Sequence, residues 1–217
     1  MAQRVDRELD VNPAFYKNQN YFRHDQMFSY WAQIDAVRNQ EPANVLEIGL
    51  GNGFVSTNLL WLGFDVKTLD VNPALDPDVV CSVTELNSQL KGQKFSMTLC
   101  CEVLEHLPLE EFERALWNIA SVTQDLVYLT LPLYGRSYGI SAHLKIPKAW
   151  RYIDWYVRLP VGRLPDMHWW EIGSSKASGR KRIMDSVRKY FDVVVARRVF
   201  GNPYHYAFLC RPCQKCK

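Results

Sequence analysis

The stretch Val45-Leu46-Glu47-Ile48-Gly49-Leu50-Gly51-Asn52-Gly53 joins a short apolar strand, residues 44–48, to a turn with glycine at three alternate positions. A helical pattern of apolar residues follows. Such a turn lets the backbone bend sharply and approach a ligand where a Cβ would collide. A dinucleotide-binding turn reads G-x-G-x-x-G, with a small last residue where helix and strand pack. Here Phe54 stands at that position and the glycine comes one residue earlier, so the spacing differs from the dinucleotide pattern.

A second strand pattern covers residues 63–70 and ends in an acid, Asp70. A carboxylate at the end of the second strand is placed to accept hydrogen bonds from both hydroxyls of a ribose. The alternative is that Asp70 caps the turn at Asn72-Pro73, because Asp and Asn-Pro both favour turns. The next strand pattern, residues 78–86, would carry the contacts to a purine base.

Two motifs resemble those of class I S-adenosylmethionine (SAM)-dependent methyltransferases. The pattern E-x-G-x-G-x-G resembles the first motif of that family, and L-C-C-E-V-L-E-H-L-P at residues 99–108 resembles the strand-four motif of its small-molecule (type 11/23-like) branch. Four motifs in this order cover residues 44–132. The resemblance implies SAM as the cofactor, with Glu47 near its methionine moiety, although many relatives have Asp where Ser82 stands. The implied cofactor-binding residues are Glu47, Gly49, Gly51, Gly53, Asp70, Val71, Ser82, Val83 and Glu102.

The expected fold is α/β, a Rossmann-like doubly wound sheet of seven strands. The sheet should be mostly parallel, with an antiparallel C-terminal strand, because strand patterns at 191–199 and 204–209 flank a Gly-Asn-Pro hairpin turn. We expect a single domain, residues 1–217. Its parts are an N-terminal cap (1–40), a cofactor-binding core (41–132), an aromatic-rich lid insertion (133–173) and a C-terminal helix and β-hairpin (174–210).

Periodicity predicts the remaining elements. Apolar residues at helical spacing indicate a helix over 25–38 that packs over the cofactor's entrance, and others over 109–120 and 174–190. Residues 125–131 form an apolar fifth strand that ends at Pro132. The stretch 133–170 shows no clear period and reads as irregular.

Composition fits a globular enzyme. Apolar residues make up 47% of 217, and no run approaches the ~18 that a membrane span needs. The N-terminus is charged and has no apolar signal core. Six cysteines without a secretion signal suggest free thiols in a reducing compartment, so we expect a cytoplasmic protein.

Charge is divided unevenly along the chain. Residues 1–133 carry 9 basic and 18 acidic side chains, whereas residues 134–217 carry 17 and 5. The basic half suggests an anionic partner, such as a phosphorylated or carboxylated metabolite, nucleic acid or an acidic membrane surface. The alternative is the solvated face of one helix, formed by Lys176, Arg180, Lys181, Arg182, Arg188 and Lys189.

The insertion is rich in aromatic residues. It holds Trp150, Tyr152, Trp155, Tyr156, Trp169 and Trp170, interleaved with Arg151, Arg158 and Arg163. Such rings could stack on a planar acceptor or a base, or lie in a membrane interface. They could equally form the core of a structural cap. The length of the stretch favours a functional lid over the acceptor.

Two histidines are candidate catalytic residues. Methyl transfer from a sulfonium requires alignment and, for weak nucleophiles, removal of a proton. His106 follows the fourth strand and His168 follows the insertion, and either could act as the base or be a structural residue. Together with Glu102 and Glu105 they resemble the ligands of metal-dependent small-RNA 2′-O-methyltransferases and of quinone-pathway O-methyltransferases. Because the strand-four motif also occurs widely in metal-free relatives, we expect no metal.

The tail spaces three cysteines as C-x-x-C-x-x-C, Cys210, Cys213 and Cys216. Closely spaced thiols suggest zinc or an iron–sulfur cluster, but a fourth ligand is missing locally. We therefore expect a frayed terminal tail.

The motifs predict a SAM-dependent methyltransferase that acts on an oxygen, and secondarily a nitrogen, of a small-molecule metabolite. The acceptor would be anionic or aromatic, with nucleic acid as the second choice of partner. The alternatives are a metal-dependent RNA 2′-O-methyltransferase and a SAM-binding protein without catalysis. RNA modification would need the basic face to line the acceptor cleft and the four candidate ligands to converge.

Overall fold

The computed structural model describes residues 11–146 and 149–214. One sheet has seven strands in the order β3-β2-β1-β4-β5-β9-β8. Strands β1 to β5 pair in parallel, and β9 is antiparallel to both of its neighbours. This confirms the predicted Rossmann-like fold. The strands are β1 (Val45–Ile48), β2 (Val66–Asp70), β3 (Val79–Val80), β4 (Phe95–Cys101), β5 (Thr123–Pro132), β8 (Phe191–Val199) and β9 (Asn202–Pro212).

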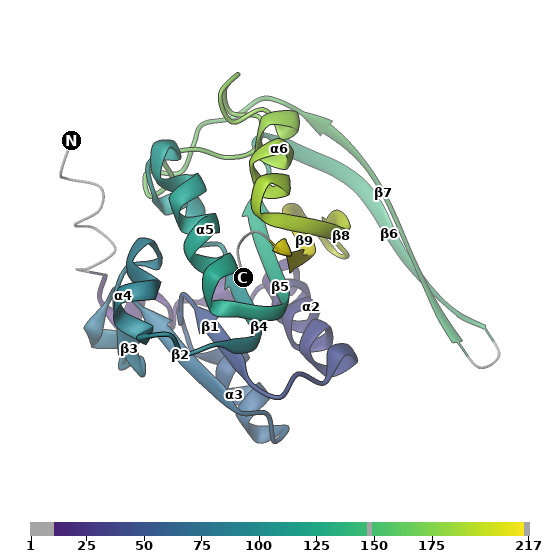
Figure 1. The fold of residues 1–217 in the computed structure, drawn as a ribbon. Helices are drawn as coiled ribbons and strands as arrows, with labels where there is room; N and C mark the ends of the chain where they lie inside the picture. The colour runs from purple at the N-terminus through teal and green to yellow at the C-terminus, as the bar shows by residue number, and fades with distance from the viewer. Residues whose placement is uncertain (1–10, 147–148, 215–217) are drawn as a thin grey trace.

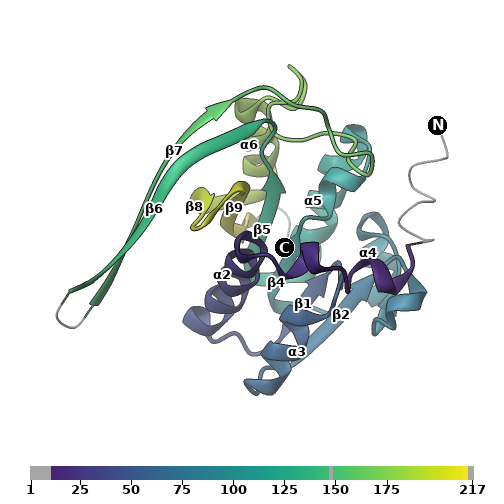
Figure 2. The ribbon, with the colours of Figure 1, turned by 180° about the vertical axis from the view of Figure 1, so that it is seen from behind.

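Helices cover both faces of the sheet (Figures 1 and 2). Helices α2 (His24–Gln40) and α3 (Phe54–Trp61) pack on one face, whereas α4 (Leu86–Leu90), α5 (Phe112–Val122) and α6 (Arg180–Tyr190) pack on the other. Short 3-10 turns connect the elements: η1 (Pro13–Phe15), η2 (Gln19–Phe22), η3 (Pro73–Leu75), η4 (Val83–Glu85), η5 (Leu104–His106) and η6 (Leu109–Glu111). Among the described residues, no helix is long and apolar enough to cross a bilayer.

Two hydrophobic cores follow from the alternation of side chains along the strands. In β5, Val127 and Leu129 pack with α4, α5 and α6, whereas Leu126 and Tyr128 pack with α2 and α3. Because both faces of the central strands are buried, these strands read as continuous apolar runs.

The order of the strands sets the position of the functional site. The chain builds β1, β2 and β3 in one direction and then returns to place β4 on the other side of β1. Ligands of open α/β sheets bind at such a switch point, outside the carboxyl ends of the strands. Here β1 ends at the glycine turn and β4 ends just before Glu102.

The insertion is not irregular, and that prediction is wrong. Strands β6 (Arg136–Ile146) and β7 (Ala149–Leu159) pair antiparallel over their whole length. They form a two-stranded ribbon that projects from the domain as a long arm (Figures 1 and 2). Apolar residues alternate with polar ones along both strands, from Tyr138 to Ile146 and from Ile153 to Leu159. This period of two was a strand signal.

Three boundaries also differ from the predictions. Helix α6 begins at Arg180 rather than Ser174. Before it, the hydroxyl of Ser178 forms hydrogen bonds with Ser174 and Ser175, which hold this segment in a turn. The third strand has only two residues, and α5 begins three residues later than expected.

The predicted frayed tail is wrong for its first part. Strand β9 runs to Pro212, Cys210 is buried, and the Cys213 N–H donates to the Tyr190 carbonyl at 2.8 Å. Cys216 lies outside the described residues.

Candidate active site

One cavity of about 710 Å³ lies at the carboxyl ends of the central strands, within the ~300–1,000 Å³ range of small-molecule sites. Both candidate catalytic histidines and eight of the nine predicted cofactor-binding residues line it. These eight are Glu47, Gly49, Gly51, Asp70, Val71, Ser82, Val83 and Glu102. Gly53 instead caps the N-terminus of α3 with φ of 69°.

Two glycines of the turn have different surroundings: a side chain would clash at Gly49 and would meet open space at Gly51. Gly49 has φ of 85°, and a Cβ there would lie 2.3 Å from Cγ2 of Val103, so this glycine lets the turn pack against the segment after β4. Gly51 has φ of 55°, and a Cβ there would meet nothing within 4 Å. Because Gly51 lines the cavity, the absence of a side chain there leaves room for a ligand to approach the backbone.

Asp70 fixes the turn at the end of β2. Its Oδ2 accepts a 2.8 Å hydrogen bond from the Leu50 N–H, and its Oδ1 accepts a 2.9 Å bond from the Asn72 N–H. The capping role considered for Asp70 is therefore present in the structure. Each carboxylate oxygen can accept more than one hydrogen bond, so both oxygens keep acceptor capacity towards the cavity that Asp70 lines.

Glu47 at the end of β1 is a buried acid on the cavity wall. Burial raises its pKa to about 8, against hydrogen bonding from Ser56, and the nearby Asp70 raises it further. Its Oε2 has no hydrogen-bond partner among the described residues. A buried acid on a cavity wall is neutral while the cavity is empty and can ionise when a cationic ligand group binds beside it.

Helix α2 lies along the cavity beside the glycine turn; its predicted place over a cofactor's entrance stays a prediction. Gln26, Tyr30 and Gln33 line the cavity. The Tyr30 hydroxyl accepts a 3.0 Å hydrogen bond from Nδ2 of Asn52, and the Tyr30 ring stacks on Phe54 at 5.1 Å. The helix is thereby joined to the glycine turn.

Glu102, the first residue after β4, has a strained backbone with φ of 55°. Its Oε2 lies 3.0 Å from Nε2 of His205, whose Nδ1 lies 2.8 Å from the Ser29 hydroxyl. Burial alone would raise the pKa of Glu102, but His205 outweighs it and the pKa falls below its usual range. A left-handed conformation at a residue other than glycine costs about 1–3 kcal/mol and clusters at functional sites.

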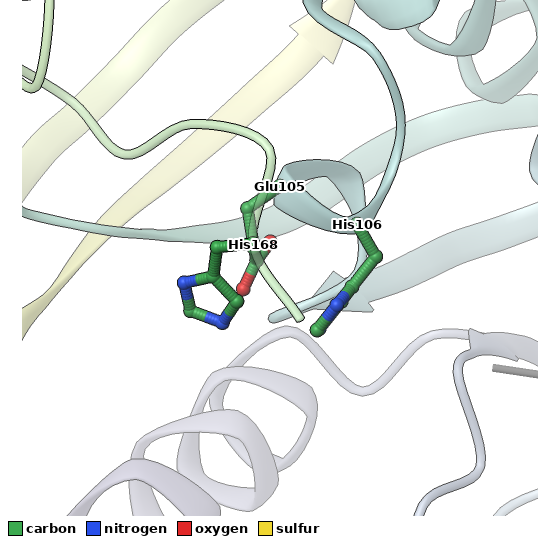
Figure 3. A group of neighbouring side chains, drawn as sticks. All are labelled: Glu105, His106 and His168. Carbon is green, nitrogen blue, oxygen red and sulfur yellow. The ribbon is translucent and has the colours of Figure 1, made fainter. Parts of the chain in front are cut away.

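Glu105, His106 and His168 come together beside Glu102. One ligand atom from each lies within 4.8 Å of the others, and Figure 3 shows His168 approaching η5 from a separate loop. Glu105 is fully buried, and neither of its carboxylate oxygens has a hydrogen-bond partner among the described residues. Burial, and then the charge of Glu102, raise the pKa of Glu105 well above its usual value.

Both histidines are held through Nδ1. The His106 Nδ1 lies 3.2 Å from the Met167 carbonyl, and the His168 Nδ1 lies 3.0 Å from Oε1 of Glu171. The Tyr204 hydroxyl donates to the same Glu171 oxygen. Such contacts select the tautomer that carries its proton on Nδ1 and keeps the Nε2 lone pair for a ligand or a proton.

Several residues of this site were missed from the sequence. Glu171, Tyr204 and His205 lie far from the strand-four motif along the chain, and only pairing of β9 with β5 brings the last two to the cavity. Aromatic residues from η1 and its surroundings also line the cavity: Phe15, Tyr16 and Tyr21. Their ring centroids lie 5.4 to 5.6 Å apart.

Other predicted features lie away from the cavity. Its lining includes Pro165 and Met167 beside His168, but not Trp155, Tyr156, Trp169 or Trp170. Trp170 is instead buried against Phe112, at a ring distance of 5.0 Å. The side chains of Trp150 and Tyr152 lie outside the described part of the structure. The six basic residues at and before α6 are exposed, and none lines the cavity. The aromatic residues of the insertion therefore did not predict which of its residues line the cavity.

The sequence matches no family model and no curated protein sequence. Several solved structures share the fold at low sequence identity. An S-adenosylmethionine-dependent methyltransferase from Clostridium acetobutylicum ATCC 824 is 9% identical with a TM-score of 0.59, covering 93% of this chain and 99% of that one. The N-methyltransferase NodS from Bradyrhizobium japonicum WM9, solved with S-adenosyl-L-homocysteine (SAH), is 12% identical with a TM-score of 0.58 and 98% coverage of both chains.

Magnesium protoporphyrin IX methyltransferase from Synechocystis PCC 6803, solved with SAM, is 17% identical with a TM-score of 0.55. The match covers 98% of this chain and 92% of that one. At such identities the likeness establishes the fold and leaves the chemistry to the residues of the cavity.

Proposed function

We propose that this chain, which has the fold of the class I SAM-dependent methyltransferases, binds SAM and transfers its methyl group to an oxygen, or secondarily a nitrogen, of a small molecule. The observation that carries this proposal is the single cavity that runs from the glycine turn and Asp70 to His106 and His168. One end has the chemistry for a nucleoside, and the other has the chemistry for taking up a proton.

The cofactor end fits SAM at two places. The space beside Gly51 is open, and Oε2 of Glu47, which has no partner among the described residues, would accept from the ammonium group of the methionine moiety. Asp70 would bind the ribose hydroxyls through the acceptor capacity that its two backbone bonds leave over. Bound there, SAM supplies an electrophilic methyl group on a sulfonium sulfur.

The acceptor end supplies a base. In this proposal Nε2 of His168 takes the proton from the acceptor hydroxyl, while Glu171 holds the ring through Nδ1 and stabilises the imidazolium that forms. His106, whose ring centroid lies 5.0 Å from that of His168, contacts the acceptor from the other side. Phe15, Tyr16 and Tyr21 give the cavity an aromatic wall that suits a planar or aromatic ligand.

Two observations argue against the alternatives. The basic residues of α6 do not reach the cavity: Arg180 packs on Tyr206 and Lys189 binds Glu113 at 2.6 Å. That disfavours RNA as the acceptor. A protein that only binds SAM would have no use for a pair of oriented histidines next to the cofactor end. The five free cysteines of the described part fit our proposal that the protein works in the reducing cytoplasm.

A screen with methyl-labelled SAM tests the proposal. The purified protein is incubated with a metabolite extract or with total RNA, each with and without a chelator. We expect label in small molecules and none in RNA. Label in RNA alone, or no transfer to either pool by a protein that binds SAM, would contradict it.

A metal-assisted variant is the second candidate, because the Glu105, His106 and His168 trio has the donor types of a divalent cation site. Both oxygens of Glu105 are buried without a hydrogen-bond partner among the described residues, and each histidine ring is held through Nδ1. A cation held there would bind the acceptor oxygen and lower its pKa. Glu102, the fourth predicted ligand, is paired with His205 instead.

Chelation separates the two candidates. If His168 acts as a base, the chelator leaves turnover unchanged, and this is the result we expect. If the trio binds a cation, turnover vanishes with chelator and returns with an added divalent ion. Calorimetric titration of the apoprotein with Mg²⁺, Mn²⁺ or Zn²⁺ gives the same answer without a known acceptor, with His168→Ala as the control that should abolish any binding.

A further inference from the structure

One face of the β6–β7 ribbon is an exposed apolar surface. Residues opposite each other in an antiparallel pair share a face, so the register places alternate residues of both strands together. The large apolar residues of this face are 40% to 72% exposed. They are Tyr138, Ile140, Leu144, Ile146, Ile153, Trp155, Val157 and Leu159, and we call this set the ribbon face.

The opposite face contacts the domain near the base of the ribbon. Arg158 donates to the Tyr134 carbonyl, and Arg198 on β8 donates to the Tyr156 carbonyl at 3.4 Å and lies over the Tyr156 ring. Asp154, the one acid of the two strands, is also on this inner face. The ribbon face is therefore the outward side of the arm that Figures 1 and 2 show projecting from the domain.

Charge indicates what the ribbon face contacts. Arg136 and Arg151 stand on this face, opposite Leu159 and Leu144, and no acid stands there. The arm also belongs to the half of the chain with 17 basic and 5 acidic side chains. Two such faces brought together would place like charges side by side, whereas anionic lipid headgroups would complement them.

The shape of the ribbon face gives a second argument. The face is long and narrow, because strands of 11 residues span about 35 Å and a two-stranded ribbon is about 10 Å wide. On a bilayer, apolar contact and headgroup attraction add along such a shallow patch.

We propose that the ribbon face docks the protein on an anionic lipid bilayer. The aliphatic residues and Trp155 enter the boundary between headgroups and acyl chains, where tryptophan is favoured. Arg136 and Arg151 reach the headgroups. The ribbon lies flat, so that the backbone groups along its open edges stay at headgroup level and keep hydrogen-bonding partners.

Vesicle sedimentation of the full chain tests this proposal. Vesicles of phosphatidylcholine alone are compared with vesicles that also contain phosphatidylserine. We expect binding to the mixed vesicles, at least ~10-fold weaker binding to the neutral ones, and a decline as salt rises. The double variant Ile140→Ser/Trp155→Ser alters a cross-strand pair that is 72% and 64% exposed, so the fold should persist. It should lose binding at least ~10-fold.

Trp61→Ser is the matched control, because Trp61 is 84% exposed on α3, away from the arm. It should bind the mixed vesicles like the unaltered chain. Failure of the unaltered chain to bind mixed vesicles, equal binding to neutral ones, or full binding by the double variant would each overturn the proposal. So would a dimer, measured by analytical ultracentrifugation, that dissociates only in the double variant, because the occupant would then be a second copy.

Discussion

The two ends of the cavity are built differently. At the proposed cofactor end, the Leu50 N–H of the glycine turn donates to the side-chain carboxylate of Asp70, and the two strands that carry these residues, β1 and β2, are neighbours in the sheet. At the acceptor end, Glu105, His168 and His205 come from three distant segments, and the oxygens of Glu105 have no partner among the described residues. The sheet fixes the backbone of the first end in advance. Each end also keeps buried carboxyl oxygens that a ligand can satisfy, Oε2 of Glu47 at the first and both oxygens of Glu105 at the second. Changes at the first end should therefore affect affinity, and changes at the second should affect turnover.

Gly51→Val should have the largest effect on affinity. A β-branched residue is strained at φ of 55°, and its side chain would fill the open space of the cavity. We expect SAM binding to fall below detection in calorimetry. Gly63→Val is the matched control, because Gly63 has φ of 90°, open space around its Cβ and no place in the cavity. If Gly63→Val loses SAM binding as well, the effect of Gly51→Val reports backbone strain rather than the site.

His168→Ala should separate the two ends. We expect turnover to fall ~10²-fold or more, as for loss of a general base, with SAM affinity unchanged. Raising the pH should partly rescue the variant, because the acceptor then ionises by itself. His24→Ala, an exposed histidine at the start of α2, serves as the control. An equal loss of SAM affinity in His168→Ala would place His168 at the wrong end of the cavity.

Asp70→Ala should weaken SAM binding by about 10-fold to 100-fold, because each lost hydrogen bond to a charged group contributes ~1.5–3 kcal/mol. Part of the loss comes from the Leu50 and Asn72 N–H groups, which lose their acceptor. Asp70→Asn keeps one oxygen acceptor, so its SAM affinity should lie between those of the unaltered chain and Asp70→Ala. Calorimetry that finds unaltered SAM affinity in a folded Asp70→Ala protein would show that the ribose does not bind at the end of β2.

The smallest effect concerns stability and pH. The pKa of Glu47 is about 8 in the folded protein, above its value of about 4.5 when unfolded. The folded state therefore holds this proton more tightly, and the resulting stability is present below pH 4.5 and is lost as the pH rises through 8. Glu47→Gln removes this loss. The variant should melt a few degrees above the unaltered chain at pH 8 and close to it at pH 5. A difference of ~1 kcal/mol in the free energy of unfolding corresponds to about 2–4 °C in melting temperature for a chain of this size. Equal melting curves at both pH values would show that Glu47 is not buried as a neutral acid.

The contrast between the two ends also explains what the sequence could predict. Glu47, the glycine turn and Asp70 lie next to strand ends, and parallel strands bring their ends to one edge. Local spacing therefore places them correctly. His205 and Tyr204 reach the cavity only because β9 inserts beside β5. No local sequence pattern predicts that β9 pairs with β5, so the sequence did not identify His205 and Tyr204 as residues of the site.

The insertion shows the opposite difficulty. Its tryptophans attracted a functional interpretation as a lid, but Trp170 packs in the core and Trp155 lies on the outward face of the arm. Aromatic content indicates that something large is buried or bound, without saying where. The alternation of Tyr138, Ile140 and Leu144 carried the better signal, because a period of two implies a strand.

The central claim is that the cavity binds SAM rather than a dinucleotide, and calorimetry on the unaltered chain tests it most directly. SAM, SAH and NAD are titrated separately into the full chain. We expect binding of SAM and SAH at one site per chain, competition between them, and no heat from NAD. Binding of NAD in place of SAM, or no binding of SAM and SAH by folded protein, would contradict it.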